Sequence, residues 1–108
     1  PGRLEQHYAP RTPLEVVPAA EIAQRVVSLR PSTVAVLAPA WAAPTEPNLV
    51  LHLVAADDPA DYARRLYEEL RRLDASGAAR LIVATPPDGP DWEAVRDRLT
   101  RASAGSAA

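Results

Sequence analysis

The stretch from Asp58 to Gly77, DPADYARRLYEELRRLDASG, constrains the fold more than any other, because it predicts one helix with both ends marked. Asp58 is a suitable N-cap, Pro59 fits the first helical position, and Gly77 supplies the left-handed residue that ends a helix. Apolar residues recur every three or four positions along one face, namely Tyr62, Ala63, Leu66, Tyr67, Leu70 and Leu73. This face must be buried against other elements of the fold.

The opposite face of this helix is predicted to be solvated. It places Arg64 four residues before Glu68 and Arg65 four residues before Glu69. Each such pair contributes only ~0.2–0.5 kcal/mol, so burial of the apolar face, rather than charge pairing, decides whether the helix forms.

The composition limits the class of protein. The chain has 108 residues, enough for one domain with a single core, and 47% of them are hydrophobic. Phe, Met and Cys are absent, so the core is built from Ala, Leu and Val with few aromatic rings. The lack of cysteine excludes disulfides, thiolate metal sites and cysteine nucleophiles, and two histidines make a structural zinc site improbable. A net charge of −2 argues against a broad nucleic-acid-binding surface.

The sequence contains neither an apolar run of ~18–20 residues nor a signal segment, so we expect no membrane association and a cytoplasmic location. Because the chain has no Met, Pro1 cannot be an unprocessed translation start. We therefore expect the chain to be part of a longer protein.

The remaining sequence alternates between predicted strands and helices. Strands are expected at 14–17, 33–38, 48–54 and 80–85, and two further helices at 18–30 and 90–102. This order predicts a layered α/β domain with a mostly parallel sheet of about four strands flanked by helices. The segment between the second and third strands is close to the shortest that carries a parallel crossover. It leaves open whether these strands are non-adjacent or whether one runs antiparallel.

Three regions are distinguished along the chain. Residues 1–13 contain three prolines and no apolar period, which is typical of an extended linker arm. Residues 14–104 form the α/β domain, and residues 105–108 are expected to be a frayed tail.

Two places at the predicted carboxyl edge of the sheet carry polar residues. Asp57 and Asp58 are a candidate acid–base or metal pair, although helix capping explains Asp58 and solvation explains Asp57. Asp88 and Gly89 lie in a Pro-Asp-Gly-Pro turn, where α/β domains tend to bind anions. Such a sequence is more often only a turn, and Asp88 would repel phosphate.

Other candidates for chemistry are weaker. His52 interrupts an apolar strand and is more often a hydrogen-bonded core or edge histidine than a ligand. Trp41 and Trp92 are most simply explained by packing in the core or at its rim. No glycine-rich phosphate loop is present, and no nucleophile stands beside a base, so no catalytic constellation is complete.

The arm concentrates functional groups in a segment without a hydrophobic face. His7, Tyr8 and Arg11 supply an imidazole, a phenol and a guanidinium within five residues, HYAPR. A purely structural explanation is that Tyr8 and Leu4 pin the arm to the domain, since ordered arms often use one aromatic anchor.

Residues 1–14, PGRLEQHYAPRTPL, resemble the linker that follows the catalytic domain in two-domain threonylcarbamoyl-AMP synthases, with HYAP as the most recognisable part. YARRLYEELRRLD and WEAVRDRLTRA are similar to two segments of that family's C-terminal domain, in the expected order and at the expected separation. The resemblance covers nearly the whole chain. It implies a Rossmann-like domain, which agrees with the predicted order of strands and helices.

The resemblance also implies a function for the longer protein. In such enzymes the N-terminal domain makes threonylcarbamoyl-adenylate from L-threonine, bicarbonate and ATP with magnesium, for threonylcarbamoyladenosine formation on tRNA. This chain lacks that domain, so the fragment itself is expected to bind no cofactor and to be non-catalytic. Its expected partners are the catalytic domain and, further, other tRNA-modification proteins. The linker is implied to close the catalytic pocket, with His7, Tyr8 and Pro10 as the substrate-gating positions.

Two alternatives remain open at this point. The chain could be an interaction or oligomerisation module that uses the Arg/Glu face of the long helix or a Trp rim. It could also be a small-ligand sensor at the carboxyl edge of the sheet, near Asp88 and Gly89.

Overall fold

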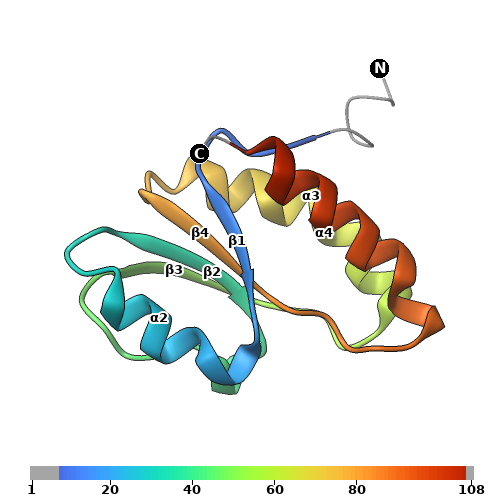
Figure 1. The fold of residues 1–108 in the computed structure, drawn as a ribbon, viewed down its shortest axis with the longest axis horizontal. Helices are drawn as coiled ribbons and strands as arrows, with labels where there is room; N and C mark the ends of the chain where they lie inside the picture. Colours follow the sequence, from blue (N-terminus) through green and yellow to red (C-terminus); the bar gives the residue numbers. More distant parts are fainter. Residues whose placement is uncertain (1–7, 107–108) are drawn as a thin grey trace.

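Four parallel strands form one sheet, shown in Figure 1. The computed structural model describes residues 8–106. The strands are β1 (Leu14–Val17), β2 (Val34–Ala38), β3 (Leu49–Val54) and β4 (Arg80–Ala84), and their order across the sheet is β1-β4-β2-β3. The predicted α/β class and parallel sheet are therefore confirmed.

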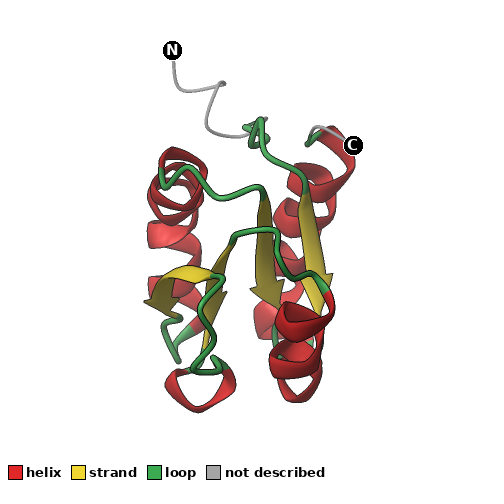
Figure 2. Ribbon diagram, turned by 90° about the vertical axis from the view of Figure 1, so that its left-hand side faces the viewer, coloured by secondary structure: helices red, strands yellow, loops and turns green. Residues whose placement is uncertain are grey.

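Helices cover both faces of this sheet (Figures 1 and 2). They are α2 (Ile22–Ser28) on one face, and α3 (Pro59–Ala75) and α4 (Glu93–Gly105) on the other. Short 3₁₀ turns precede α2 at Ala19–Glu21 and α4 at Pro90–Trp92, and a third lies between β2 and β3 at Ala40–Ala42. Among the residues described, no helix is long and apolar enough to cross a membrane.

The ends of α3 lie where the sequence predicts them. Asp58 Oδ2 accepts a hydrogen bond from Asp61 N at 2.9 Å, which caps the first turn, and Pro59 is the first helical residue. Gly77 has φ +83°, a conformation that glycine adopts without strain. The helix therefore starts and stops because of its own local sequence.

The sheet separates two apolar clusters. On the side of α3 and α4 the buried residues include Ala35, Leu37, Leu66, Leu70, Leu73, Leu81, Val83, Val95 and Leu99. On the side of α2 they include Ile22, Val26, Val34, Val36, Ala38 and Ile82. Alternate residues of the central strands β2 and β4 thus enter opposite clusters, which explains why both strands are apolar at nearly every position.

The open question about the second and third strands is answered by the pairing. β2 and β3 are adjacent and parallel, with Val36 opposite His52. The connection of ten residues, 39–48, can span ~33 Å when extended, more than the length of either strand, so it returns to the start of β3 without a long helix. It passes on the α2 side, because Ala42 packs in that cluster.

Three side chains lie in surroundings other than those predicted. Trp41, in the 3₁₀ turn after β2, is 70% exposed instead of packed. Glu69 is only 4% exposed, although the pattern assigns it to the solvated face. Its Oε2 accepts from Arg65 at 3.0 Å, as predicted, whereas Arg64 pairs with Asp61 and not with Glu68.

The predictions for Trp92 and His52 are confirmed. Trp92 is buried and packs edge-to-face on Tyr62, with ring centroids 5.4 Å apart. His52 lies on an edge strand and makes a hydrogen bond of 3.0 Å between Nε2 and Ala38 O.

Candidate functional site

The arm is fastened to the end of α3 by one carboxylate. Asp74 accepts four hydrogen bonds from it: from Thr12 Oγ1 at 2.7 Å, Arg11 N at 3.0 Å, Thr12 N at 3.1 Å and Tyr8 Oη at 3.2 Å. Two of these donors are main-chain amides of the arm, so the carboxylate fixes the path of the backbone as well as two side chains. We call this arrangement the Asp74 clamp.

The electrostatics of Asp74 agree with this geometry. Partial burial raises the pKa of its carboxyl, but the hydrogen bonds from Thr12, Arg11 and Tyr8 outweigh that effect, and the pKa is lowered below its usual value. The ionised form is therefore the one that the arm stabilises.

Tyr8 adds an aromatic contact to the clamp. Its ring meets Tyr67 edge-to-face with centroids 6.4 Å apart, and the guanidinium carbon of Arg71 lies 5.2 Å from the ring centroid. Burial and the nearby charge of Asp74 raise the pKa of Tyr8 to about 12. Tyr8 is therefore a neutral hydrogen-bond donor throughout the physiological range.

The arm also meets the end of α4. Pro10 is buried, and a Cβ built on Gly105 would lie 2.9 Å from the Cβ of Ala9, closer than two carbon atoms can pack. Glycine at position 105 therefore lets the arm approach the last turn of α4. Ser106 Oγ accepts from Leu14 N at 3.1 Å, which joins the same helix end to β1.

Of the three predicted gating positions, the described residues include two. Tyr8 belongs to the Asp74 clamp, and Pro10 is buried. His7 lies outside the described residues and is joined to Tyr8 by one peptide bond.

Sequence reasoning did not identify Asp74 as a site residue. One signal was available, because Asp74 stands in the last turn of α3, where a negative charge opposes the helix dipole by ~0.3–1 kcal/mol. A residue placed against the dipole needs a compensating partner, and the amides of Arg11 and Thr12 are that partner. More than sixty residues separate Asp74 from Arg11 and Thr12 in the chain, so the local sequence pattern does not indicate this contact.

A small cavity lies at the carboxyl edge of the sheet. Its volume is about 120 Å³, and its wall consists of Pro39, Ala55, Ala56, Asp57, Tyr62, Ala84, Thr85, Pro86, Pro87 and Trp92. Most of these residues are apolar, so the wall is mostly apolar. The hydroxyl oxygen of Tyr62 is shut off from solvent and has no hydrogen-bond partner among the described residues. Asp88 and Gly89 are exposed and follow this wall without being part of it. Gly89 has φ +110°, which the turn requires.

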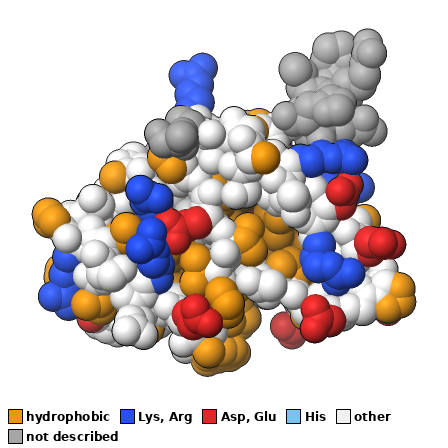
Figure 3. Space-filling view, in the orientation of Figure 1, with side chains coloured by type: hydrophobic (Ala, Val, Ile, Leu, Met, Phe, Trp, Pro, Cys, Tyr) orange, Lys and Arg blue, Asp and Glu red, His pale blue; other side chains and the backbone are white. Residues whose placement is uncertain are grey.

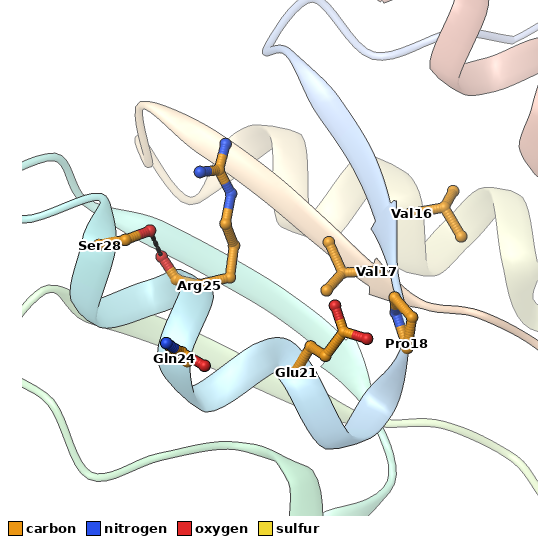
Figure 4. Close-up of a pocket in the computed structure, with 7 residues that line it drawn as sticks. All are labelled: Val16, Val17, Pro18, Glu21, Gln24, Arg25 and Ser28. Atoms are coloured by element: carbon orange, nitrogen blue, oxygen red, sulfur yellow. Dashed lines mark hydrogen bonds between the residues drawn. The ribbon is translucent and has the colours of Figure 1, made fainter.

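A larger and shallower cleft of about 540 Å³ separates β1 from α2 (Figure 4). Its basic lining residue, Arg25, is already paired, because it donates to both oxygens of Glu15 at 2.7 and 2.9 Å. Arg80 donates to the same carboxylate at 3.0 Å. These hydrogen bonds, those from Arg25 first, lower the pKa of Glu15. The cleft therefore offers an anionic ligand no unpaired positive charge from Arg25.

Charges on the face shown in Figure 3 do not form a field of one sign. Basic and acidic side chains are intermixed on it. Within residues 8–106, no group of three His, Asp or Glu side chains could hold a metal ion.

Comparison with known proteins adds one finding. A family model described as the C-terminal domain of threonylcarbamoyl-AMP synthase matches residues 1–104 of the chain. This match includes both the arm and the α/β domain on which the arm rests. Among curated proteins, none matches the chain.

Proposed function

The chain belongs to the family of threonylcarbamoyl-AMP synthase C-terminal domains, and we propose that it is a non-catalytic domain that regulates or closes the active site of a catalytic domain preceding it. The parent protein would use ATP, L-threonine, bicarbonate and magnesium to make threonylcarbamoyl-adenylate for tRNA modification. Closure of a segment over an active site can exclude water and commit substrates without supplying a reacting group.

The Asp74 clamp is the observation that carries this proposal. It holds the arm at a defined place on the domain, with four hydrogen bonds to one carboxylate. A segment that leaves a fixed point reaches a partner domain at a smaller entropic cost than a free linker, because fewer of its conformations are lost. The domain thus fixes the position from which the arm reaches the catalytic domain.

We assign different roles to the residues of HYAP. Tyr8 and Pro10 anchor the arm, since the ring and hydroxyl of Tyr8 are occupied by Tyr67, Arg71 and Asp74. His7, which precedes the anchor directly, is then the residue of this motif that contacts the catalytic pocket. The imidazole would meet substrate, while the anchor sets its position.

Steady-state kinetics of the complete enzyme test this division of roles. His7→Ala should lower kcat or raise KM for L-threonine and ATP. Asp74→Ala should change the same parameters through the arm, because losing the clamp costs about 1 kcal/mol or more, roughly a five-fold change in the fraction of fastened arms. Unchanged kcat and KM in His7→Ala would show that the arm does not gate the site.

Asp97→Asn is the matched control for charge removal. Asp97 is an exposed carboxylate on α4 whose partner is Arg101 at 2.9 Å, and it takes no part in the four hydrogen bonds of the Asp74 clamp. Its kinetics should equal those of the unmodified enzyme. Gly105→Ala supplies an independent perturbation, since the added methyl group must displace Ala9 without touching Asp74.

A further inference from the structure

The small cavity at the carboxyl edge lies where the connections of the sheet change from one face to the other. β4 and β2 are neighbours and run parallel. The segment after β4 leads to α4 on one face, whereas the segment after β2 passes on the face of α2, where Ala42 packs. Open parallel α/β sheets bind ligands in the crevice at such a change of face. The wall of the cavity includes Pro39, directly after β2, and Ala84, the last residue of β4, so the cavity occupies this crevice.

The less exposed part of the wall is apolar. Its buried and half-buried members are Pro39, Ala55, Ala56, Tyr62, Ala84, Pro86 and Trp92. The hydroxyl oxygen of Tyr62 is shut off from solvent, so this residue offers the cavity only its ring. The volume of about 120 Å³ is smaller than the ~150 Å³ of a protein cavity that binds benzene. The cavity therefore suits a group of about four or five non-hydrogen atoms.

The wall also carries one unpaired charge. Asp57, Thr85 and Pro87 are its exposed members, so the cavity opens to solvent on their side. Within residues 8–106, the carboxylate of Asp57 has neither a hydrogen bond nor an ion pair. Among the described residues that form the wall, none is basic. Arg96, which is not part of the wall, donates to Pro87 O at 2.9 Å.

We propose that this cavity binds a small free amine as its ammonium ion, with the apolar chain inside and the ammonium group at the mouth beside Asp57. An anion would meet the charge of Asp57 without a basic partner in the wall. A neutral apolar molecule would fill the cavity but leave the carboxylate without a counter-ion. A chain of four carbons with one nitrogen has the size that the volume accommodates.

The arrangement of the wall favours a free amine over the lysine side chain of a partner protein. The charge of Asp57 lies on the exposed side, and the buried side is apolar. A free alkylamine enters with its methyl end first and keeps its ammonium group at the mouth. A lysine side chain enters with its ammonium group first, which would place the charge against the apolar residues.

The site is separate from the arm and goes beyond the role proposed for it. Tyr62 lies in the first turn of α3 and Asp74 in the last, twelve residues later. At 1.5 Å per residue the cavity and the Asp74 clamp are ~18 Å apart along the helix. Failure of the gating kinetics would therefore leave the amine site untouched, and the reverse also holds.

Nuclear magnetic resonance titration of the 108-residue chain with n-butylammonium chloride tests the site. The amide resonances of Ala56, Asp57 and Thr85 should shift and saturate, with a dissociation constant in the millimolar range. Butan-1-ol has the same chain without the charge, and it should bind roughly two- to five-fold more weakly, because it lacks the ion pair. Sodium butyrate should bind more weakly still. Sodium chloride keeps the ionic strength equal in the three titrations.

Variants of the wall locate the binding. Asp57→Asn should lower the affinity for n-butylammonium to that for butan-1-ol and leave the affinity for butan-1-ol unchanged. Asp91→Asn is the matched control, since Asp91 is exposed and precedes Trp92 in the chain without being part of the wall. It should titrate like the unmodified chain. Ala56→Leu adds three carbon atoms to the wall and should weaken binding of both probes, with circular dichroism to verify its fold.

Four results would overturn the proposal. The first is an absence of saturable shifts at the wall residues. The second is equal or tighter binding of butan-1-ol or butyrate, and the third is an unchanged affinity for n-butylammonium in Asp57→Asn. The fourth is tighter binding of Nα-acetyl-L-lysine N-methylamide than of n-butylammonium, which would identify a lysine side chain as the occupant.

Discussion

At the scale of single residues, Asp74 connects the arm to the domain. Its carboxylate lies in the last turn of α3, an unfavourable place for a negative charge, and receives four hydrogen bonds from the arm. Tyr8 depends on the same charge, because Asp74 accepts a hydrogen bond from its hydroxyl group and opposes its ionisation. A measurement on either residue therefore reports on the state of the Asp74 clamp.

The first prediction concerns the phenol of Tyr8. In Asp74→Asn the nearby negative charge is lost while the burial of the ring remains, so the pKa of Tyr8 should fall part of the way from about 12 toward the ordinary value near 10. Ultraviolet absorbance of tyrosinate during a titration measures this change, and subtraction of a Tyr8→Phe titration assigns it. An identical titration in Asp74→Asn would contradict the clamp.

The second prediction concerns the pH at which the arm is released. The pKa of Asp74 is lower in the folded chain than its unfolded value of ~3.9, so the ionised carboxylate stabilises the folded arm fully above about pH 4. That stabilisation is lost as the pH falls through the lower, folded-state pKa. The amide resonances of Arg11 and Thr12 should stay constant from neutral pH to about 4 and shift below it. A midpoint above 4 would show that another group controls them.

At the scale of elements, the long helix α3 is defined by its local sequence and used by distant segments. Its cap at Asp58 and its stop at Gly77 are set locally, whereas its last turn binds the arm through Asp74 and its inner face packs against the sheet. Buried Glu69 shows where the local pattern is insufficient. Burial raises the pKa of Glu69, and the charge of Arg65 opposes that effect.

The third prediction tests the stop of α3. Gly77→Ala should lower the free energy of unfolding by about 1 kcal/mol, because a side chain at φ +83° costs roughly 1–2 kcal/mol and the stiffer unfolded chain returns part of it. No atom lies within 4 Å of the added methyl group, so the loss is conformational and not steric. Urea denaturation measures it. Gly77→Asn should lose less, since asparagine tolerates this conformation better.

At the scale of the whole molecule, the sheet is shared by two apolar clusters that cannot melt separately. β4 gives Leu81 and Val83 to one cluster and Ile82 to the other, so loss of either cluster exposes the same strand. The domain should therefore unfold as one cooperative unit.

The fourth prediction follows from this shared sheet. Leu70→Ala and Ile82→Ala, one in each cluster, should each lower the free energy of unfolding by about 2–5 kcal/mol. In a Trp41→Phe background the fluorescence of buried Trp92 reports on the α3 side, and far-ultraviolet circular dichroism reports on all helices. The two signals should have the same midpoint in every variant, and separate midpoints would show that the clusters unfold independently.

The sequence by itself determined the elements and the fold class, because caps, glycine stops and apolar periods act within a few residues. It also directed attention to HYAP, through the concentration of functional groups around Tyr8. Only the tertiary structure decided that Asp74 receives the arm and that β2 and β3 are neighbours. These features depend on strand order and on contacts between residues far apart in the chain, which local periodicity does not encode.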